Sequence, residues 1–285
     1  MKVSVKLLTV FMPLSLLFLV PDAHAKRILF ASQFSLIPEK DAHVVFGHES
    51  EAAINPKSIK VMVWNLKKGQ EKGLDRDLPL YGKDRDLLLF SEGYLSEPVK
   101  AIFDSFSGIR WDMGVSFLYK KDKNTKTGTM IGSRYAPTYV RVRHTKDHEP
   151  IINTPKALTM AKYPIAGSNK ELLVISIHGI NLVSRAAFAR HLAMAVDEIK
   201  SHDGPVIFGG DFNTQVRSKA SLLIKTISSL GMQSLEFRND KRNVVLGNHI
   251  DYTFVRGLYA KDAEVLGELK SSDHKAMLAE LAVIE

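Results

Sequence analysis

The 285-residue sequence contains no cysteine, which excludes a disulfide framework, a thiol nucleophile and any metal site built on cysteine sulfur. It also has no fixed-period repeat and no low-complexity tract, which excludes repeat and fibrous architectures. It has no uninterrupted apolar run of about 20 residues, the length that a membrane-spanning helix needs. With 45% hydrophobic and 25% charged residues, the composition is typical of a globular domain with a substantial core.

The first 25 residues have the three parts of a secretory signal peptide. Lys2 and Lys6 give the start a positive charge, the apolar run Leu7–Val20 follows, and Ala23-His24-Ala25 has the small residues of a cleavage site. An uncleaved membrane anchor is the alternative, but a run of 14 residues interrupted by Thr9, Pro13 and Ser15 is short for a membrane span. We therefore predict a signal peptide over residues 1–25, cleavage after Ala25, and a secreted or periplasmic protein.

The remainder of the chain is expected to form one domain behind a short extension. Residues 26–58 are mixed in character, and Val44-Val45-Phe46 indicates one short added strand. From residue 59 to residue 285 the pattern is regular, with helices predicted at 94–106, 184–201 and 219–230. We assign residues 26–58 to an N-terminal extension and residues 59–285 to the main domain.

Five short apolar runs predict buried strands, at residues 59–65, 86–92, 172–178, 205–211 and 249–255. Each run ends in, or contains, a polar side chain that could bind a metal ion or transfer a proton. We expect a sheet to bring these strand ends together along one edge, where binding sites form. The polar residues in and near these runs are Asn65, Glu92, His178, Asp211, Asn213, Asp251, Asp273 and His274.

Six segments that carry these residues resemble the ordered motifs of the endonuclease/exonuclease/phosphatase superfamily. One such motif alone is weakly or moderately specific, but six in the right order and spacing make a strong signal. The resemblance extends from about residue 59 to residue 285. The segments are Val63-Trp64-Asn65-Leu66, Phe90-Ser91-Glu92, Ile177-His178-Gly179-Ile180-Asn181, Gly209-Gly210-Asp211-Phe212-Asn213-Thr214, His249-Ile250-Asp251-Tyr252 and Ser271-Ser272-Asp273-His274.

The resemblance implies an α/β fold in which two packed, mainly antiparallel β-sheets are flanked by helices, a four-layer α/β/β/α sandwich. It also implies a metal-dependent phosphoric ester hydrolase that uses Mg²⁺ or Mn²⁺. Glu92 would be the main metal ligand, with Asn65 and Asp273 beside it, because hard cations prefer oxygen ligands.

The resemblance implies catalytic roles for five further residues. His274 would be the general base that activates water, and Asp251 would orient its ring. Asp211 and Asn213 would position the nucleophile and the phosphoryl oxygens, and His178 would donate a hydrogen bond to a phosphate or leaving oxygen. Taken singly, each has a structural explanation, such as a turn residue or a hydrogen-bonding histidine. Their occurrence together favours catalysis.

The substrate is not determined by the resemblance. The net charge of +8, which falls to +7 without the leader, favours an anionic partner such as nucleic acid. Asn181, Arg134 and Arg217 are candidates for substrate binding: Arg134 follows Gly132-Ser133, which looks like the family's Ser-Arg strand end, and Arg217 follows the Gly-Asp-Phe-Asn loop.

No aromatic-rich hairpin suited to membrane insertion is found, so a nuclease or general phosphodiesterase is favoured over a sphingomyelinase-like enzyme. An inositol-phosphate phosphatase is also compatible with these motifs. A catalytically inactive binding protein is disfavoured, because every expected site position is filled. We expect a monomer with no membrane span after removal of the leader.

Overall fold

The structure is a computed structural model that describes residues 33–284. The predicted signal peptide lies outside the described residues. Within residues 33–284, no helix has both the length and the apolar character needed to cross a membrane.

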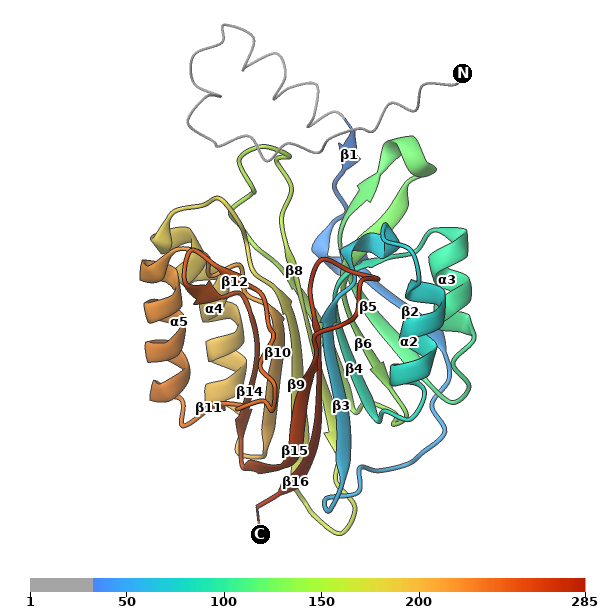
Figure 1. The fold of residues 1–285 in the computed structure, drawn as a ribbon, viewed down its shortest axis with the longest axis vertical. Helices are drawn as coiled ribbons and strands as arrows, with labels where there is room; N and C mark the ends of the chain where they lie inside the picture. Colours follow the sequence, from blue (N-terminus) through green and yellow to red (C-terminus); the bar gives the residue numbers. More distant parts are fainter. Residues whose placement is uncertain (1–32, 285) are drawn as a thin grey trace, which may run out of the picture.

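Two β-sheets pack face to face, and helices cover the outer surface of each (Figure 1). The first sheet has the strand order β1-β5-β6-β4-β3-β16-β15, with β2 also paired to β5. Its strands are β1 (Phe34–Ser35), β2 (His43–Gly47), β3 (Ile59–Asn65), β4 (Leu87–Tyr94), β5 (Arg110–Tyr119), β6 (Thr125–Ser133), β15 (Leu258–Leu266) and β16 (Ala276–Val283).

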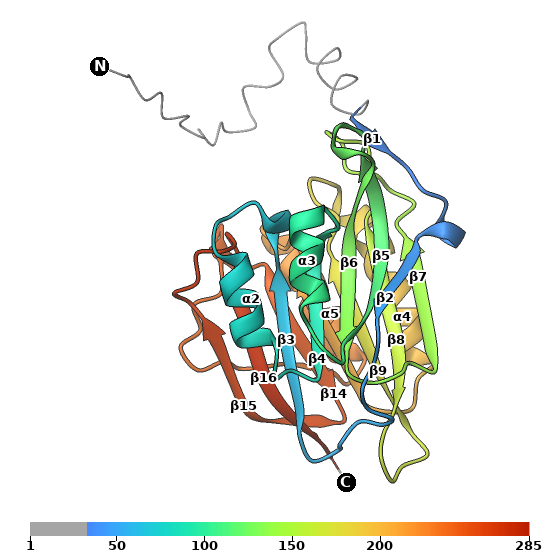
Figure 2. The same ribbon diagram turned by 90° about the vertical axis from the view of Figure 1, so that its right-hand side faces the viewer.

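The second sheet has the order β11-β14-β10-β9-β8-β7. Its strands are β7 (Tyr139–His144), β8 (Ala157–Pro164), β9 (Glu171–His178), β10 (Val206–Asp211), β11 (Gln233–Ser234) and β14 (Asp251–Arg256). Helices α2 (Leu74–Gly82) and α3 (Glu97–Asp104) cover the first sheet, whereas α4 (Arg185–Lys200) and α5 (Arg217–Ser229) cover the second (Figures 1 and 2). This is the four-layer α/β/β/α sandwich that was expected.

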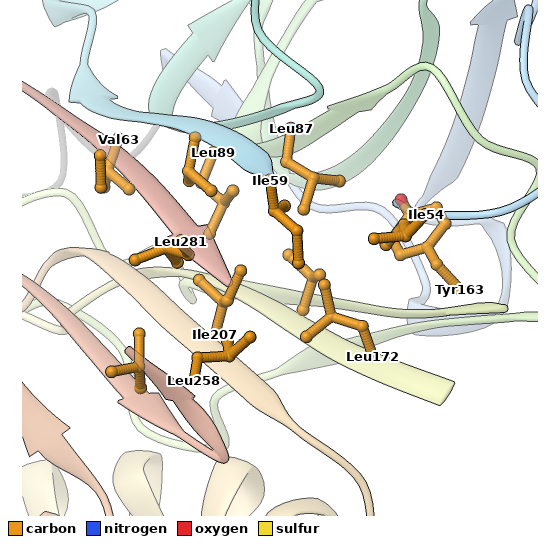
Figure 3. Packing of buried hydrophobic residues seen from close by; sticks show 14 of the residues in the cluster. Ile54, Ile59, Val63, Leu87, Leu89, Tyr163, Leu172, Ile207, Leu258 and Leu281 are labelled. Carbon is orange, nitrogen blue, oxygen red and sulfur yellow. The ribbon is translucent and has the colours of Figure 1, made fainter. Parts of the chain in front are cut away.

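The apolar runs form strands buried on both faces, so successive side chains supply two different cores. In β3, Val61 and Val63 point to the core between the sheets, whereas Met62 and Trp64 pack toward α2 and α3. Figure 3 shows part of the core between the sheets. Each fully buried aliphatic side chain contributes about 1.5–3 kcal/mol relative to exposure.

Each sheet has one parallel pair at its centre, β3 with β4 and β9 with β10, and all other strand pairs of the two sheets are antiparallel. A parallel pair requires a crossover connection, which α2 and α4 provide. The carboxyl ends of the two strands in each pair therefore lie at the same end of the sheet.

All five predicted strands are present, as β3, β4, β9, β10 and β14, and the three predicted helices correspond to α3, α4 and α5. Helix α2 was not predicted, because Pro79 lies inside it and proline usually interrupts helical patterns. Residues His43–Gly47, in the predicted extension, form β2 and pair with β5.

Candidate active site

A cavity of about 650 Å³ opens at the end of the sandwich where β3, β4, β9 and β10 terminate. Asn65 and Asp251 are buried next to the residues of its wall. The site is therefore built from both sheets, and not from the edge of one sheet as the strand pattern alone suggested. The predicted site residues that line the cavity are Glu92, His178, Asn181, Asp211, Asn213, Asp273 and His274.

Strand register brings three of the predicted site residues to one level of the second sheet. Asp211, the last residue of β10, pairs with His178 on β9 and with Asp251 on β14. The loops that follow β9 and β10 approach each other closely, because a Cβ atom on Gly179 would lie 2.2 Å from the carbonyl oxygen of Phe212. Only glycine fits at this position without moving the backbone.

His274 and Asp251 form a hydrogen-bonded pair. The Nδ1 atom of His274 lies 2.8 Å and 3.0 Å from the two carboxylate oxygens of Asp251. The opposite ring nitrogen, Nε2, lies 3.8 Å from Oδ2 of Asp211. Burial opposes protonation of His274, but the charges of Asp251 and Asp211 outweigh it and raise the pKa of the imidazole. Burial raises the pKa of the Asp211 carboxyl, because it disfavours the charged form, although the positive charge of His274 opposes this shift.

The loop that carries His274 is fixed to the end of β3. The Ser272 hydroxyl donates to the carbonyl oxygen of Asn65 at 2.7 Å and accepts from the backbone N–H of His274 at 3.2 Å. The indole N–H of Trp64 donates to the carbonyl oxygen of His274 at 3.1 Å. The Trp-Asn and Ser-Asp-His motifs therefore hold each other in place.

Glu92 is directed into the cavity by an irregularity in β4. The register with β6 shifts between Phe90 and Gly93, and Glu92 has a positive φ of 53°. Such a conformation is unfavourable for a residue with a side chain and is common at functional sites. The Asn65 amide donates to Asp211 at 3.0 Å and to Glu92 at 3.4 Å, and so links the two carboxylates.

The Glu92 carboxylate is paired with the ammonium of Lys68. Burial opposes ionisation of Glu92, but the positive charge of Lys68, with a further contribution from Lys156, outweighs it and holds the pKa of the carboxyl well below its usual range. Lys68 was not predicted, and its place directly beyond the Trp-Asn motif was the signal that could have identified it.

The side chains of this site fit a divalent cation. Glu92 and Asp211 are joined through one amide, and Asp273 also lines the cavity, so several oxygen ligands face the same space. Ligand atoms of Asp211, Asp251 and His274 also lie within 4.8 Å of one another. The Asp251 carboxylate is already hydrogen-bonded to His274, however, so Glu92 and Asp211 are the better-placed ligands. Asp273 contacts Lys67 Nζ at 3.2 Å and is about half exposed.

His178 has two neighbours that were not predicted, Lys156 and Glu149. The Lys156 ammonium lies 3.4 Å from Nδ1 of His178 and 3.3 Å from Oε2 of Glu149. Because an ammonium can only donate, Nδ1 must accept and the ring hydrogen must lie on Nε2. Burial and the charge of Lys156 both lower the pKa of His178. His178 is therefore a neutral hydrogen-bond donor. Its Nε2 atom lies 3.9 Å from Oε1 of Glu92 and 3.7 Å from Oδ2 of Asp211.

Asn213 and Asn181 support the loops around the cavity. The Asn213 amide donates to the carbonyl oxygen of Gly179 at 2.8 Å, and its backbone N–H donates to Oδ1 of Asp211 at 2.8 Å. Asn213 thus orients Asp211 and joins two loops. The backbone N–H of Asn181 donates to Oε1 of Glu149 at 2.9 Å, its side-chain oxygen accepts from the backbone N–H of Leu182 at 2.8 Å, and the residue lines the cavity.

The two arginines predicted to bind substrate lie elsewhere. The prediction for Arg134 is wrong: β4 and β6 are antiparallel, and Leu87 pairs with Ser133, so Arg134 lies at the far end of β4 from Glu92. Its guanidinium is bonded to the backbone carbonyls of Arg85 and Lys83. Arg217 is exposed at the start of α5, two residues beyond Gln215, and lies outside the cavity wall.

Comparisons with known proteins agree with the motifs and the fold. The sequence profile of the Endonuclease/Exonuclease/phosphatase family matches residues 62–274. A "UPF0294 protein" of Klebsiella pneumoniae (strain 342) is 29% identical over 225 residues, which cover 79% of this chain and 82% of that protein.

Solved structures share the fold at low sequence identity. An endonuclease/exonuclease/phosphatase of Beutenbergia cavernae has a TM-score of 0.61 at 14% identity, covering 80% of this chain and 72% of that one. The mannosyl-6-phosphatase Bt3783 of Bacteroides thetaiotaomicron has a TM-score of 0.55 at 18% identity, covering 79% of this chain and all of that one.

Proposed function

The chain belongs to the Endonuclease/Exonuclease/phosphatase family, and from this premise we propose that it hydrolyses a phosphoester with a water molecule activated by His274. The observation that carries the proposal is the His274–Asp251 hydrogen bond beside Asp211 in the cavity wall. A histidine held by a buried carboxylate on one nitrogen presents the other nitrogen to the nucleophile.

The other residues have roles that follow from their contacts. His178, with its hydrogen on Nε2, donates to a phosphoryl or leaving oxygen as negative charge develops there. Lys156 fixes the tautomer of His178, and Asn213 orients Asp211. These side chains are held in place before substrate enters, so little reorganisation is required during the reaction.

We propose that activity depends on a divalent cation, Mg²⁺ or Mn²⁺, held by Glu92 and Asp211 with Asn65 and Asp273 nearby. A cation bound there supplies positive charge that stabilises the phosphoryl oxygens in the transition state. The oxygen-rich ligand set supports this choice of metal.

Two substrate classes are supported by observations. Nucleic acid is favoured by the net charge of +8 and by Lys67, Lys68 and Lys156 in the cavity wall. Arg134 lies away from the cavity and adds no positive charge to its wall. A phospholipid is favoured by exposed aliphatic side chains near the cavity mouth, among them Val245, which lines the cavity.

A substrate panel tests the proposal. Purified protein is assayed with Mg²⁺ or Mn²⁺ on plasmid DNA, RNA, sphingomyelin and inositol phosphates, with His274→Ala as the matched control. We expect hydrolysis of at least one substrate, loss of activity with EDTA, and activity lowered by about 10²–10⁴ in the variant. Equal hydrolysis by both proteins would contradict the proposed role of His274.

We also propose that the protein is exported and cleaved after Ala25. The three-part leader supports this proposal. Mass spectrometry of the mature protein should find Lys26 as its first residue. An intact Met1 on a cytoplasmic pool would contradict it.

A further inference from the structure

Exposed aliphatic side chains surround the mouth of the cavity. They lie on four loops, and each loop also supplies a residue to the cavity wall: Ile152, Asn181, Gln215 and Asn243. Six of the twelve large hydrophobic side chains exposed in residues 33–284 lie on these loops, so they gather at this end of the molecule. We call them the apolar rim: Ile151, Leu182, Val216, Val244, Val245 and Leu246.

The most exposed member of the apolar rim is Leu246, at the tip of a hairpin between β12 (Val244–Val245) and β13 (Asn248–His249). Its side chain is 81% exposed. The two turn residues, Leu246 and Gly247, have φ angles of 51° and 78°, the pattern of a type I′ turn. The first position of this turn favours asparagine, aspartate or glycine, and a bulky apolar residue is unfavourable there. Neither turn geometry nor packing within the fold accounts for leucine at this tip.

The hairpin is fixed to a neighbouring part of the apolar rim. The Asn248 amide donates to the carbonyl oxygen of Gln215 at 2.9 Å, and the Thr214 hydroxyl donates to the carbonyl oxygen of His249 at 2.7 Å. Val216 follows directly and is 51% exposed. The hairpin that carries Leu246 and the loop that carries Val216 are therefore held together by hydrogen bonds.

Within residues 33–284, the only charged residues directly beside the apolar rim are arginines, and the acidic residues farther along these loops are paired with cations: Asp147 with Arg190, Glu149 with Lys156 and Asp240 with Arg242. The segments 150–153, 181–185, 215–217 and 243–248 contain no aspartate or glutamate, but they include Arg185 and Arg217, both exposed. Aliphatic tips flanked by arginine match a lipid–water interface, where apolar side chains enter the acyl region and cations meet anionic headgroups. A nucleic-acid surface would instead require a denser array of cations with aromatic stacking platforms.

The chain also enters the described structure at this end. Phe34 in β1 pairs with Tyr119, and Tyr119 lines the cavity. Figure 1 shows β1 and β12 toward one end of the molecule, with the C-terminus at the other. The first described strand therefore lies at the same end of the molecule as the apolar rim.

We propose that the apolar rim docks on an anionic phospholipid bilayer, with Leu246 inserted below the headgroups and Arg185 and Arg217 bound to lipid phosphates. The cavity mouth then faces the membrane surface. Docking does not depend on the proposed hydrolysis, so each can be tested separately.

The test is co-sedimentation of the chain from Lys26 with sucrose-loaded vesicles of phosphatidylcholine alone or mixed with phosphatidylglycerol. We expect binding to the mixed vesicles. Leu246→Asn should weaken it at least tenfold, because the largest apolar contact is lost. Asparagine is favoured in this turn, so melting temperature should be unchanged or higher.

The matched control is Ile284→Asn. Ile284 is 57% exposed and follows β16 at the opposite end of the molecule, so its replacement should leave vesicle binding unchanged. Arg217→Gln should weaken binding to the mixed vesicles and leave binding to neutral vesicles unaltered. Hydrolysis of a soluble phosphodiester by Leu246→Asn should equal that of the wild type, because the tip lies outside the cavity wall.

Three outcomes would overturn the proposal. The first is no binding of the wild type to either kind of vesicle. The second is equal binding by Leu246→Asn and wild type. The third is loss of a dimer or of DNA binding in Leu246→Asn with vesicle binding intact, which would assign the apolar rim to another partner. Failure of the wild type to hydrolyse any substrate of the panel would contradict the proposed function alone.

Discussion

Replacing Lys156 by methionine tests how His178 is held as a donor. The Lys156 ammonium lies 3.4 Å from Nδ1 of His178, and its side chain is only 8% exposed. A hydrogen bond from a charged group contributes about 1.5–3 kcal/mol. If this contact stabilises the donor tautomer mainly in the transition state, its loss lowers kcat by roughly 10- to 150-fold. KM should change much less, because a transition-state interaction is removed.

The same substitution has a structural cost that must be separated from catalysis. Without Lys156, the Glu149 carboxylate, whose side chain is 11% exposed, loses its ion-pair partner. The double variant Lys156→Met/Glu149→Gln removes both charges, while the glutamine oxygen can still accept from the backbone N–H of Asn181. We expect the double variant to regain thermal stability but to keep the low kcat.

Steady-state kinetics on a soluble phosphodiester at saturating metal, together with thermal unfolding, provides the measurement. The control is Lys162→Met on β8, where the lysine Nζ lies 3.0 Å from Glu198 Oε1 on the helix-covered face. Its kcat should equal that of the wild type. Recovery of wild-type kcat in the double variant would refute the reasoning, because Lys156 would then serve only to neutralise Glu149.

Three further predictions concern the metal, the base and the acid stability of the fold. Glu92→Gln should weaken Mn²⁺ binding in calorimetric titrations, since a neutral amide replaces the main carboxylate ligand, and an unchanged affinity would rule out this assignment. His274→Ala should lower kcat by about 10²–10⁴ with folding intact, and adding Asp251→Asn should cost little more because the pair acts as a unit; fully multiplicative losses would show that they act separately. Burial opposes ionisation of Asp112, but hydrogen bonds from His43 and Arg110 outweigh it and lower the carboxyl pKa below its usual 3.8. The ionised Asp112 carboxylate therefore stabilises the folded state above pH 3.8, and this stabilisation is lost as pH falls through the folded-state pKa. Asp112→Asn should lower the free energy of unfolding in urea by about 1.5–3 kcal/mol at pH 7 and by less at pH 3. An equal loss at both pH values would contradict this.

The apolar runs predicted the buried strands, because these depend on local signals, whereas the sandwich was implied by the resemblance of the six motifs to a known family. Buried strands appear as short apolar runs, and the polar residue that ends each run is visible in the sequence. What such a run does not show is the direction of its strand. Arg134 also follows a strand, but β6 runs antiparallel to β4, so this strand end lies at the opposite end of the sheet from Glu92.

The residues that the sequence did not reveal act through long-range contacts. Lys156 lies between the proline-containing loop 150–155 and β8, and only the folded chain places it against His178, 22 residues away. The hairpin at Leu246 was also missed, because its exposed residues are aliphatic and a membrane-inserting hairpin was expected to be rich in aromatic residues. Its exposure follows from the tertiary structure and not from the composition of residues 244–249.

The order of strands in the first sheet has a consequence for how the chain can fold. Its last hairpin, β15 and β16, returns to the first sheet and pairs with β3, more than 200 residues earlier in the sequence. Until residues 276–283 are available, β3 has an open edge, and the Ser272 hydroxyl that fixes the end of β3 is missing. Folding therefore cannot be completed from the N-terminus while synthesis proceeds, and long-range closure of this kind is slow. A nascent chain with this topology stays incompletely folded until its last strand emerges, a state in which it can still pass through a narrow translocation channel.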